Sequence, residues 1–342
     1  MKIIPEILFS KLRTLTSVLG TLVILQGCAN VSSQEGNPVT VNGSSTVYPI
    51  SKVIIEQFQS QNPDTAKIES DFSGTGGGFK KFCAKETAIN AASRPISTVE
   101  MKECDRSGVR YIELPIAFDA ITVVVNPQNK AINSITVGEL KRIWQPEAQG
   151  KVTRWQQVRT DLPNNPLTLY GPGKDSGTYG YFTEAIVGRE GASRQDYVFS
   201  EDDKVLVNGV AQDPNAMGYF GLAYYEQHQD KLKALGIDNG KGAVLPSAET
   251  VKKAEYQPLT RPLFIYVNAQ MAQENPQIEK FVEYYLEKAA EVSKEVGYIP
   301  LPAEGYHLAK IHFQRGKVGT VFGGKPEFNL TIGELMRKQG EF

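Results

Sequence analysis

The sequence predicts an α/β protein with two lobes, and three observations predict this class. A strand, a loop of Gly, Ser and Thr, and a helix recur in that order, which is typical of sheets covered by helices. Two buried β runs, Ala120–Asn126 and Leu263–Asn268, both end in Val-Asn and enclose a middle segment, as two crossings between lobes would require. The chain has 342 residues, 41% of them hydrophobic, which is more than one small core needs.

The first half contains two complete strand–loop–helix units. The β-branched run Val39–Val41 precedes the loop 42–46, and residues 48–58 carry apolar side chains at helical spacing. Residues 68–72 then alternate like a strand and lead through the glycine-rich loop 73–78 into a second helix.

The middle and C-terminal segments continue the pattern. Thr136 and Glu139 have the spacing of a capping box. Residues 167–170 predict a strand that runs through a Gly-rich loop into a helix. A long helix is expected to start at Asn275-Pro276 and to stop at Gly297, where a glycine can cap the C-terminus.

We interpret the two crossings as paired hinge strands. This assigns residues 39–125 and 268–342 to lobe I, which is discontinuous, and residues 126–267 to lobe II.

The N-terminus reads as an export signal. Residues 1–27 combine positive charge with an apolar run, 15–25, that is too short to span a bilayer. The segment ends Leu-Gln-Gly-Cys28, which resembles the lipobox of bacterial lipoproteins, and residues 28–38 have the composition of a tether. We therefore expect the protein in the periplasm or on the outer face of the cell membrane, with Cys28 as a lipid anchor. A free cysteine after an ordinary signal peptide is the alternative.

Export also bears on the two remaining cysteines. Cys83 and Cys104 would lie in an oxidising compartment with no competing thiol once Cys28 is lipidated. We predict a disulfide between them, and two buried thiols are the alternative.

Composition and charge exclude several classes of protein. Lys and Arg number 37 against 38 Asp and Glu, and this balance argues against a nucleic-acid partner. Three cysteines and three histidines leave little material for a metal site, so no metal or cofactor is expected. Any anion that the protein binds would therefore have to be held by a local arrangement of hydrogen-bond donors rather than by overall positive charge.

Three junctions between a strand and a helix could supply that geometry. They are Gly43–Thr46, Ser73–Gly78 and Asp175–Thr178. The first turn of a helix has backbone N–H groups without intrahelical partners and favours negative charge, and each hydroxyl adds a donor. A single such loop is usually just a helix cap, but three in one chain predict an oxyanion site facing a cleft.

Enzyme motifs are not matched. A dinucleotide-binding loop would need glycine at Phe79, and Gly240-Lys241 is followed by Gly242 rather than by Ser or Thr. Ser176 has Lys174 two positions before it, so it does not form the elbow of a serine hydrolase. We expect no catalytic residue.

At these residues the sequence resembles the PstS-type phosphate-binding proteins of bacterial ABC phosphate transporters, most closely the cyanobacterial SphX-like branch. The resemblance spans the mature chain in order. It implies a type II periplasmic-binding-protein fold, with two lobes joined by two hinge strands and the ligand held between them. The matching segments are 43–49, 73–79 with Phe82-Cys83, 92–96, 171–178, 218–221 and 261–267.

The resemblance also implies the ligand contacts. Carried over by position, these are Ser45, Thr46, Ser73, Thr75, Gly76, Ser176, Gly177 and Thr178. Well-studied members have an aspartate where Arg94 stands and an arginine just before the second-lobe loop, where this chain has none. We therefore expect Arg94 to contact the anion as its main cation, with a structural arginine as the alternative.

Because Arg94 stands where well-studied members have an aspartate, another carboxylate must accept the proton of hydrogen phosphate. Such an acceptor would reject sulfate, which has no proton to donate. Asp175 is the first candidate, followed by Asp71 and Asp119. Asp175 could equally be a helix N-cap.

The function implied by the resemblance is a high-affinity receptor for inorganic phosphate that acts outside the cytoplasm. It would work as a monomer and deliver phosphate to an ABC permease and its ATPase after the lobes close. The alternatives are a binding protein for sulfate, molybdate or arsenate, a secreted phosphatase, and a surface protein of phosphate starvation.

Overall fold

The structure is a computed structural model that describes residues 39–325, 327 and 329–342. The predicted signal peptide, the tether and Cys28 lie outside the described residues. Within the described part of the chain, no helix is long and apolar enough to cross a membrane.

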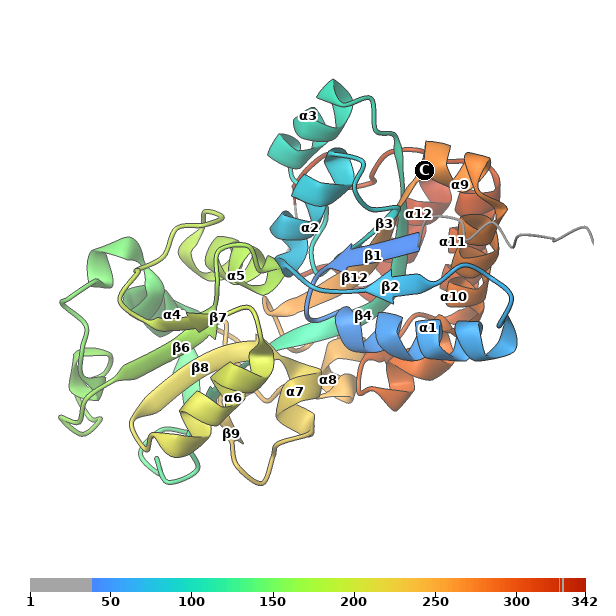
Figure 1. The fold of residues 1–342 in the computed structure, drawn as a ribbon. Helices are drawn as coiled ribbons and strands as arrows, with labels where there is room; N and C mark the ends of the chain where they lie inside the picture. The colour runs from blue at the N-terminus through green and yellow to red at the C-terminus, as the bar shows by residue number, and fades with distance from the viewer. Residues whose placement is uncertain (1–38, 326, 328) are drawn as a thin grey trace, which may run out of the picture. The chain divides into compact units, whose positions relative to one another are not determined.

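A mixed β-sheet forms the centre of the fold, in the strand order β2-β1-β3-β12-β4-β8-β6-β7, and β9 and β13 also pair with β4 (Figure 1). A second, small sheet has the order β11-β10-β5. The strands are β1 (Val39–Gly43), β2 (Ile68–Ser70), β3 (Ile89–Ala92), β4 (Tyr111–Val125), β5 (Ser134–Thr136), β6 (Thr168–Pro172), β7 (Val198–Ser200), β8 (Ala216–Gly221), β9 (Lys233–Ala234), β10 (Gly236–Asp238), β11 (Ala243–Val244), β12 (Thr260–Asn268) and β13 (Ile299–Pro300).

The long strand β4 belongs to two groups of strands. Up to Ala120 it pairs antiparallel with β12, and from Ile121 onward it pairs with β8. We call the group β1, β2, β3, β12 and β13 lobe I, and the group β5 to β11 lobe II. The predicted strand 120–126 is thus the second half of a longer element. Its first half escaped prediction because Glu113, Pro115 and Asp119 interrupt the apolar run. The lobe boundaries after Val125 and before Asn268 remain predictions.

Helices cover the sheet, as the recurring strand–loop–helix units predict. The long helix α10 packs against α1 and α11, and Figure 1 shows these helices together beside the lobe I strands. The helices are α1 (Tyr48–Gln61), α2 (Gly74–Cys83), α3 (Thr98–Arg106), α4 (Val137–Trp144), α5 (Gly177–Phe182), α6 (Asp203–Gln212), α7 (Leu222–Glu226), α8 (Ala248–Lys252), α9 (Ala269–Glu274), α10 (Pro276–Glu295), α11 (Ala303–Gln314) and α12 (Ile332–Glu341), and a π-helical turn, η3 (Thr183–Val187), continues α5.

The predicted helix ends are confirmed by their caps. Thr136 and Glu139 form the capping box at the start of α4. Asn275 caps α10 by accepting a hydrogen bond from the amide of Gln277. Helix α10 ends just before Gly297, whose φ of 90° is readily adopted only by glycine.

The predicted disulfide is confirmed. Cys83 at the end of α2 is bonded to Cys104 on α3, with the two Cα atoms 4.4 Å apart. The bond therefore ties the helix that follows the second Gly-rich loop to α3.

Candidate anion-binding site

The first predicted loop connects β1 to α1. Both Ser45 and Thr46 are buried, with 7% and 1% of their surface exposed. The amide of Thr46 donates to Ser44 Oγ at 3.2 Å, and the hydroxyl of Tyr298 donates to the Thr46 carbonyl at 2.6 Å. These bonds fix the loop without using the hydroxyl of Thr46.

The second loop starts α2 and is held by neighbouring lobe I strands. Ser73 donates its hydroxyl to Asn42 Oδ1 at 2.6 Å. Thr75 is fully buried, and its Oγ1 accepts a hydrogen bond from the Ser93 amide at 3.1 Å. The two hydroxyls of Thr75 and Ser93 lie 3.3 Å apart.

The third loop, on lobe II, starts α5. Ser176 is the N-cap, because its Oγ accepts a hydrogen bond from the Thr178 amide at 3.1 Å. The alternative role of Asp175 as N-cap is therefore wrong. Gly177 is required by close packing, since a Cβ there would lie 2.3 Å from Thr75 Oγ1 and 2.4 Å from Ser93 Oγ.

The three loops meet, as the sequence predicts. Thr46 Oγ1 lies 3.4 Å from Thr178 Oγ1, which joins the first loop to the third. The amide of Gly76 donates to the Asp175 carbonyl at 3.0 Å, which joins the second loop to the third. Hydroxyls from both lobes therefore surround one point.

A buried arginine that the sequence analysis did not select lies at the same point. Arg261 on β12 is directly opposite Asp119 on β4, and its Nη2 donates to Asp119 Oδ2 at 2.8 Å. The same Nη2 donates to Thr46 Oγ1 at 3.2 Å. Arg261 is 0% exposed, and its Nη1 has no hydrogen-bond partner among the residues that the structure describes. A guanidinium with a free donor in a buried site is suited to an anion.

Asp203 is a second site residue that the sequence analysis missed. It is the first residue of α6, and Ser45 donates its hydroxyl to Asp203 Oδ2 at 3.4 Å. Burial is the main cause that raises the pKa of Asp203 to about 7, and the nearby Asp119 carboxylate raises it further, while Arg261 opposes the rise. A carboxyl with such a pKa can exchange a proton with a bound ligand near neutral pH.

Arg94 lies beside these loops, but its two terminal nitrogens are occupied. Its Nη1 and Nη2 donate to the two carboxylate oxygens of Glu100 at 2.9 and 2.8 Å. Its Nε lies 3.2 Å from Glu190 Oε1, an ion pair that is not a hydrogen bond, so Nε has no hydrogen-bond partner among the described residues. The arrangement differs from the one that we expected of the main cation, because two carboxylates already neutralise Arg94, whereas a terminal nitrogen of Arg261 has no partner among those residues.

The first two candidates for the proton acceptor also lie elsewhere. The Asp175 carboxylate is about half exposed and pairs with Lys80 at 2.9 Å. Asp71 is exposed and accepts a hydrogen bond from the Phe72 amide. Asp119, the third candidate, does lie in the site.

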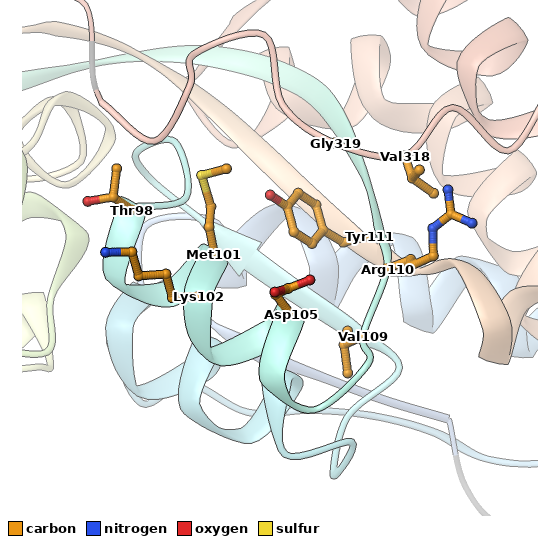
Figure 2. Close-up of a pocket in the computed structure, with 9 residues that line it drawn as sticks. All are labelled: Thr98, Met101, Lys102, Asp105, Val109, Arg110, Tyr111, Val318 and Gly319. Atoms are coloured by element: carbon orange, nitrogen blue, oxygen red, sulfur yellow. The ribbon is translucent and has the colours of Figure 1, made fainter.

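A surface cavity of about 440 Å³ lies apart from these loops, between α3, the start of β4 and residues 318–319 (Figure 2). Met101 and Tyr111 contribute its apolar lining, and Lys102, Asp105 and Arg110 add charges. No residue of the three loops lines it. Among the described residues there is also no group of three or more His, Cys, Asp or Glu side chains placed to hold a metal ion.

Comparison with known proteins identifies the family. The model of the PBP superfamily domain matches residues 29–289. Protein SphX of Synechocystis sp. is 58% identical over 321 residues, which cover 94% of this chain and 95% of that protein. The phosphate-binding protein PstS of Staphylococcus saprophyticus is 33% identical, over 85% of this chain and 90% of that protein. The chain belongs to the PstS-type phosphate-binding proteins, in the SphX-like branch.

Solved structures agree with the two-lobed fold of the PstS type. The crystal structure of a possible phosphate binding protein from Planctomyces limnophilus is 39% identical, with a TM-score of 0.62, and covers 82% of this chain and 99% of its own. A putative phosphate ABC transporter substrate-binding protein from Clostridium perfringens is 24% identical, also with a TM-score of 0.62, and covers 78% and 100%. This PstS-type chain therefore has the periplasmic-binding-protein fold, which was predicted.

Proposed function

We propose that this protein is an extracytoplasmic receptor that binds inorganic phosphate and delivers it to an ABC transporter. The observation that carries the proposal is the buried Arg261. Its Nη1 has no hydrogen-bond partner among the described residues, and its Nη2 donates to Thr46 Oγ1, which lies 3.4 Å from Thr178 Oγ1 of the other lobe. The names of the relatives, SphX and phosphate-binding protein PstS, agree with it.

Phosphate binds between the loops, with Arg261 as its main cation. Thr46 and Thr178 donate from opposite lobes, and Ser45, Thr75, Ser176 and Gly177 complete the enclosure with hydroxyl and amide groups. Ser73 and Gly76 shape the second loop instead, because the Ser73 hydroxyl donates to Asn42 and the Gly76 amide donates to the Asp175 carbonyl. Hydrogen bonds to a charged group are stronger than neutral ones, and a dry site strengthens them further. A micromolar dissociation constant needs about −8 kcal/mol, which such a set can supply after desolvation.

Selectivity over sulfate comes from Asp203, with Asp119 beside it. Ionised Asp203 accepts the proton of hydrogen phosphate, while sulfate offers lone pairs only. The charge of Asp119 is balanced by Arg261 at 2.8 Å, so Asp203 is the better acceptor of the two. This assignment replaces Asp175 as first candidate.

Binding leads to delivery. The lobes close about β4 and β12, and the closed form docks on a membrane permease that a cytoplasmic ATPase drives. The receptor acts as a monomer without catalytic activity and is held outside the cytoplasm by a lipid on Cys28, after cleavage of residues 1–27.

Isothermal titration of the purified protein with phosphate, and separately with sulfate, tests the proposal. We expect heat and one site per chain with phosphate, and weak or no binding of sulfate. Equal binding of the two anions would favour a general oxyanion receptor, and no phosphate binding would refute the proposal. A phosphomonoesterase assay with added Zn²⁺ and Mg²⁺ tests the absence of enzymatic activity.

A further inference from the structure

We propose that Arg94 and Glu190 form an ion pair that holds the lobes closed and thereby sets the rate at which the ligand is released. The inference rests on the proposed function for its ligand, but it concerns residues outside the anion site. Arg94 follows β3 in lobe I, and Glu190 follows η3 in lobe II. Their 3.2 Å contact therefore crosses between the lobes.

Lobe I holds Arg94 rigidly. Glu100 binds two of its nitrogens and also accepts a hydrogen bond from the Ser97 amide at 2.8 Å, as part of the capping box of α3. The disulfide at Cys104 fixes the same helix to α2. The Arg94 side chain is only 8% exposed, so it is presented to lobe II with little freedom left to lose.

Helix α5 of lobe II receives the ion pair directly. A Cβ on Gly180 would lie 2.9 Å from Glu190 Oε1 and 3.2 Å from Arg94 Nε. The two charged groups therefore lie against the bare backbone of the helix whose first turn contains Gly177 and Thr178. Moving Arg94 away from Glu190 would separate lobe I from the helix that supplies the lobe II donors.

A second ion pair also joins the two lobes, but it is weaker because its side chains are more exposed to solvent. Lys80 and Asp175 lie 2.9 Å apart, yet their side chains are 66% and 52% exposed, where solvent and salt screen the attraction. The first pair is not hydrogen-bonded, whereas Lys80 does donate to Asp175, but Arg94 is buried and Glu190 is 39% exposed, so solvent screens the attraction between them less. We therefore assign the larger effect on closure to Arg94 and Glu190.

Arg94 and Glu190 touch only when the lobes are closed. Loss of the ion pair should therefore raise the rate at which the lobes open and release phosphate more than it changes the rate at which phosphate first binds. Stopped-flow measurement of phosphate binding and release tests this in Glu190→Gln and Glu190→Lys. We expect release to accelerate about three- to fivefold in Glu190→Gln and at least tenfold in Glu190→Lys, with association changed less than twofold. Glu249→Gln is the matched control, because Glu249 pairs with Lys253 only four residues further along the chain, so this ion pair does not join the two lobes. Its release rate should equal that of the unaltered protein.

A measurement without phosphate separates the two proposals. Small-angle scattering of the ligand-free protein should give a larger radius of gyration for Glu190→Lys than for the unaltered protein and for Glu249→Gln. Unchanged release rates, or an unchanged radius of gyration, would overturn the ion-pair proposal even if phosphate binds well. Failure of the unaltered protein to bind phosphate, with the radius still increased in Glu190→Lys, would instead refute the proposed ligand and support the ion pair.

Discussion

Arg261 and Asp119 lie directly opposite each other on β12 and β4, with Arg261 Nη2 2.8 Å from Asp119 Oδ2 and both side chains fully buried. They occupy the place where β4 changes its partner from β12 to β8. Asp119 offsets the cost of burying the guanidinium, and Nη1 is left without a hydrogen-bond partner within the part of the chain that the structure describes. The main charge of the site is therefore built into the strands that join the lobes.

Replacing Arg261 by lysine tests its role as the main cation. Lysine keeps the positive charge beside Asp119 but loses the second terminal nitrogen and the planar geometry. We expect the dissociation constant for phosphate to rise about 100-fold, measured by isothermal titration. The exposed Arg337, which pairs with Glu341 on α12, provides the control Arg337→Lys. Equal affinity in both variants would contradict the role of Arg261.

Asp203→Asn tests the source of selectivity. The amide still accepts a hydrogen bond but can also donate one to sulfate, so the preference for phosphate over sulfate should fall by about 100-fold. Competition titration at pH 8 measures this. Asp175→Asn is the matched control and should leave the preference unchanged, because the Asp175 carboxylate pairs with Lys80. A loss of preference in Asp175→Asn alone would restore Asp175 as the acceptor.

The raised pKa of Asp203 also predicts how the free energy of unfolding of the ligand-free protein depends on pH. Its pKa in the folded protein is about 7, against an ordinary value of 3.8, so the folded state binds more protons than the unfolded state between these values. Stability from this group is present below about pH 4 and is lost as the pH rises to about 7, by an amount on the order of a few kcal/mol. Asp203→Asn should therefore raise the melting temperature at pH 8 more than at pH 4. A difference that is independent of pH would contradict the assigned cause.

Gly177→Ala tests the close contact between the second and third loops. The added methyl group would lie 2.3 Å from Thr75 Oγ1, so the loops must separate. We expect phosphate affinity to fall at least tenfold. The melting temperature should change little, because the lobes can relieve the clash by opening. Gly150→Ala is not a suitable control, since φ at Gly150 is 67°. Gly340→Ala on α12 is suitable, because a Cβ there meets no atom within 4 Å.

Loss of the Cys83–Cys104 disulfide should weaken the fold. The bond closes a loop with a sequence separation of 21, and its removal in the double alanine variant is expected to cost about 3 kcal/mol of unfolding free energy. Urea unfolding with and without reductant measures this. The unaltered protein should lose stability on reduction, whereas the variant should not respond to reductant.

The local patterns of the sequence predicted the three loops well, because each loop is defined by a strand, a helix start and small residues between them. The charged residues of the site were harder to predict. Arg261 and Asp119 each interrupt an apolar strand, and that pairing of opposite charges in the two hinge strands was the available signal. Asp203 follows Glu201 and Asp202 and looks like an ordinary helix start, so nothing local marks it as buried. Arg94 was selected by position in the family, but its partner Glu190 is distant in sequence.

The central claim is that Arg261 holds the anion between hydroxyls of the two lobes. A crystal structure of the protein with phosphate bound tests it most directly. The claim predicts a phosphate oxygen about 3 Å from Arg261 Nη1, with Thr46 and Thr178 on either side and Arg94 still paired with Glu100 and Glu190. Phosphate bound to Arg94 instead, with Arg261 Nη1 remote from it, would contradict the claim.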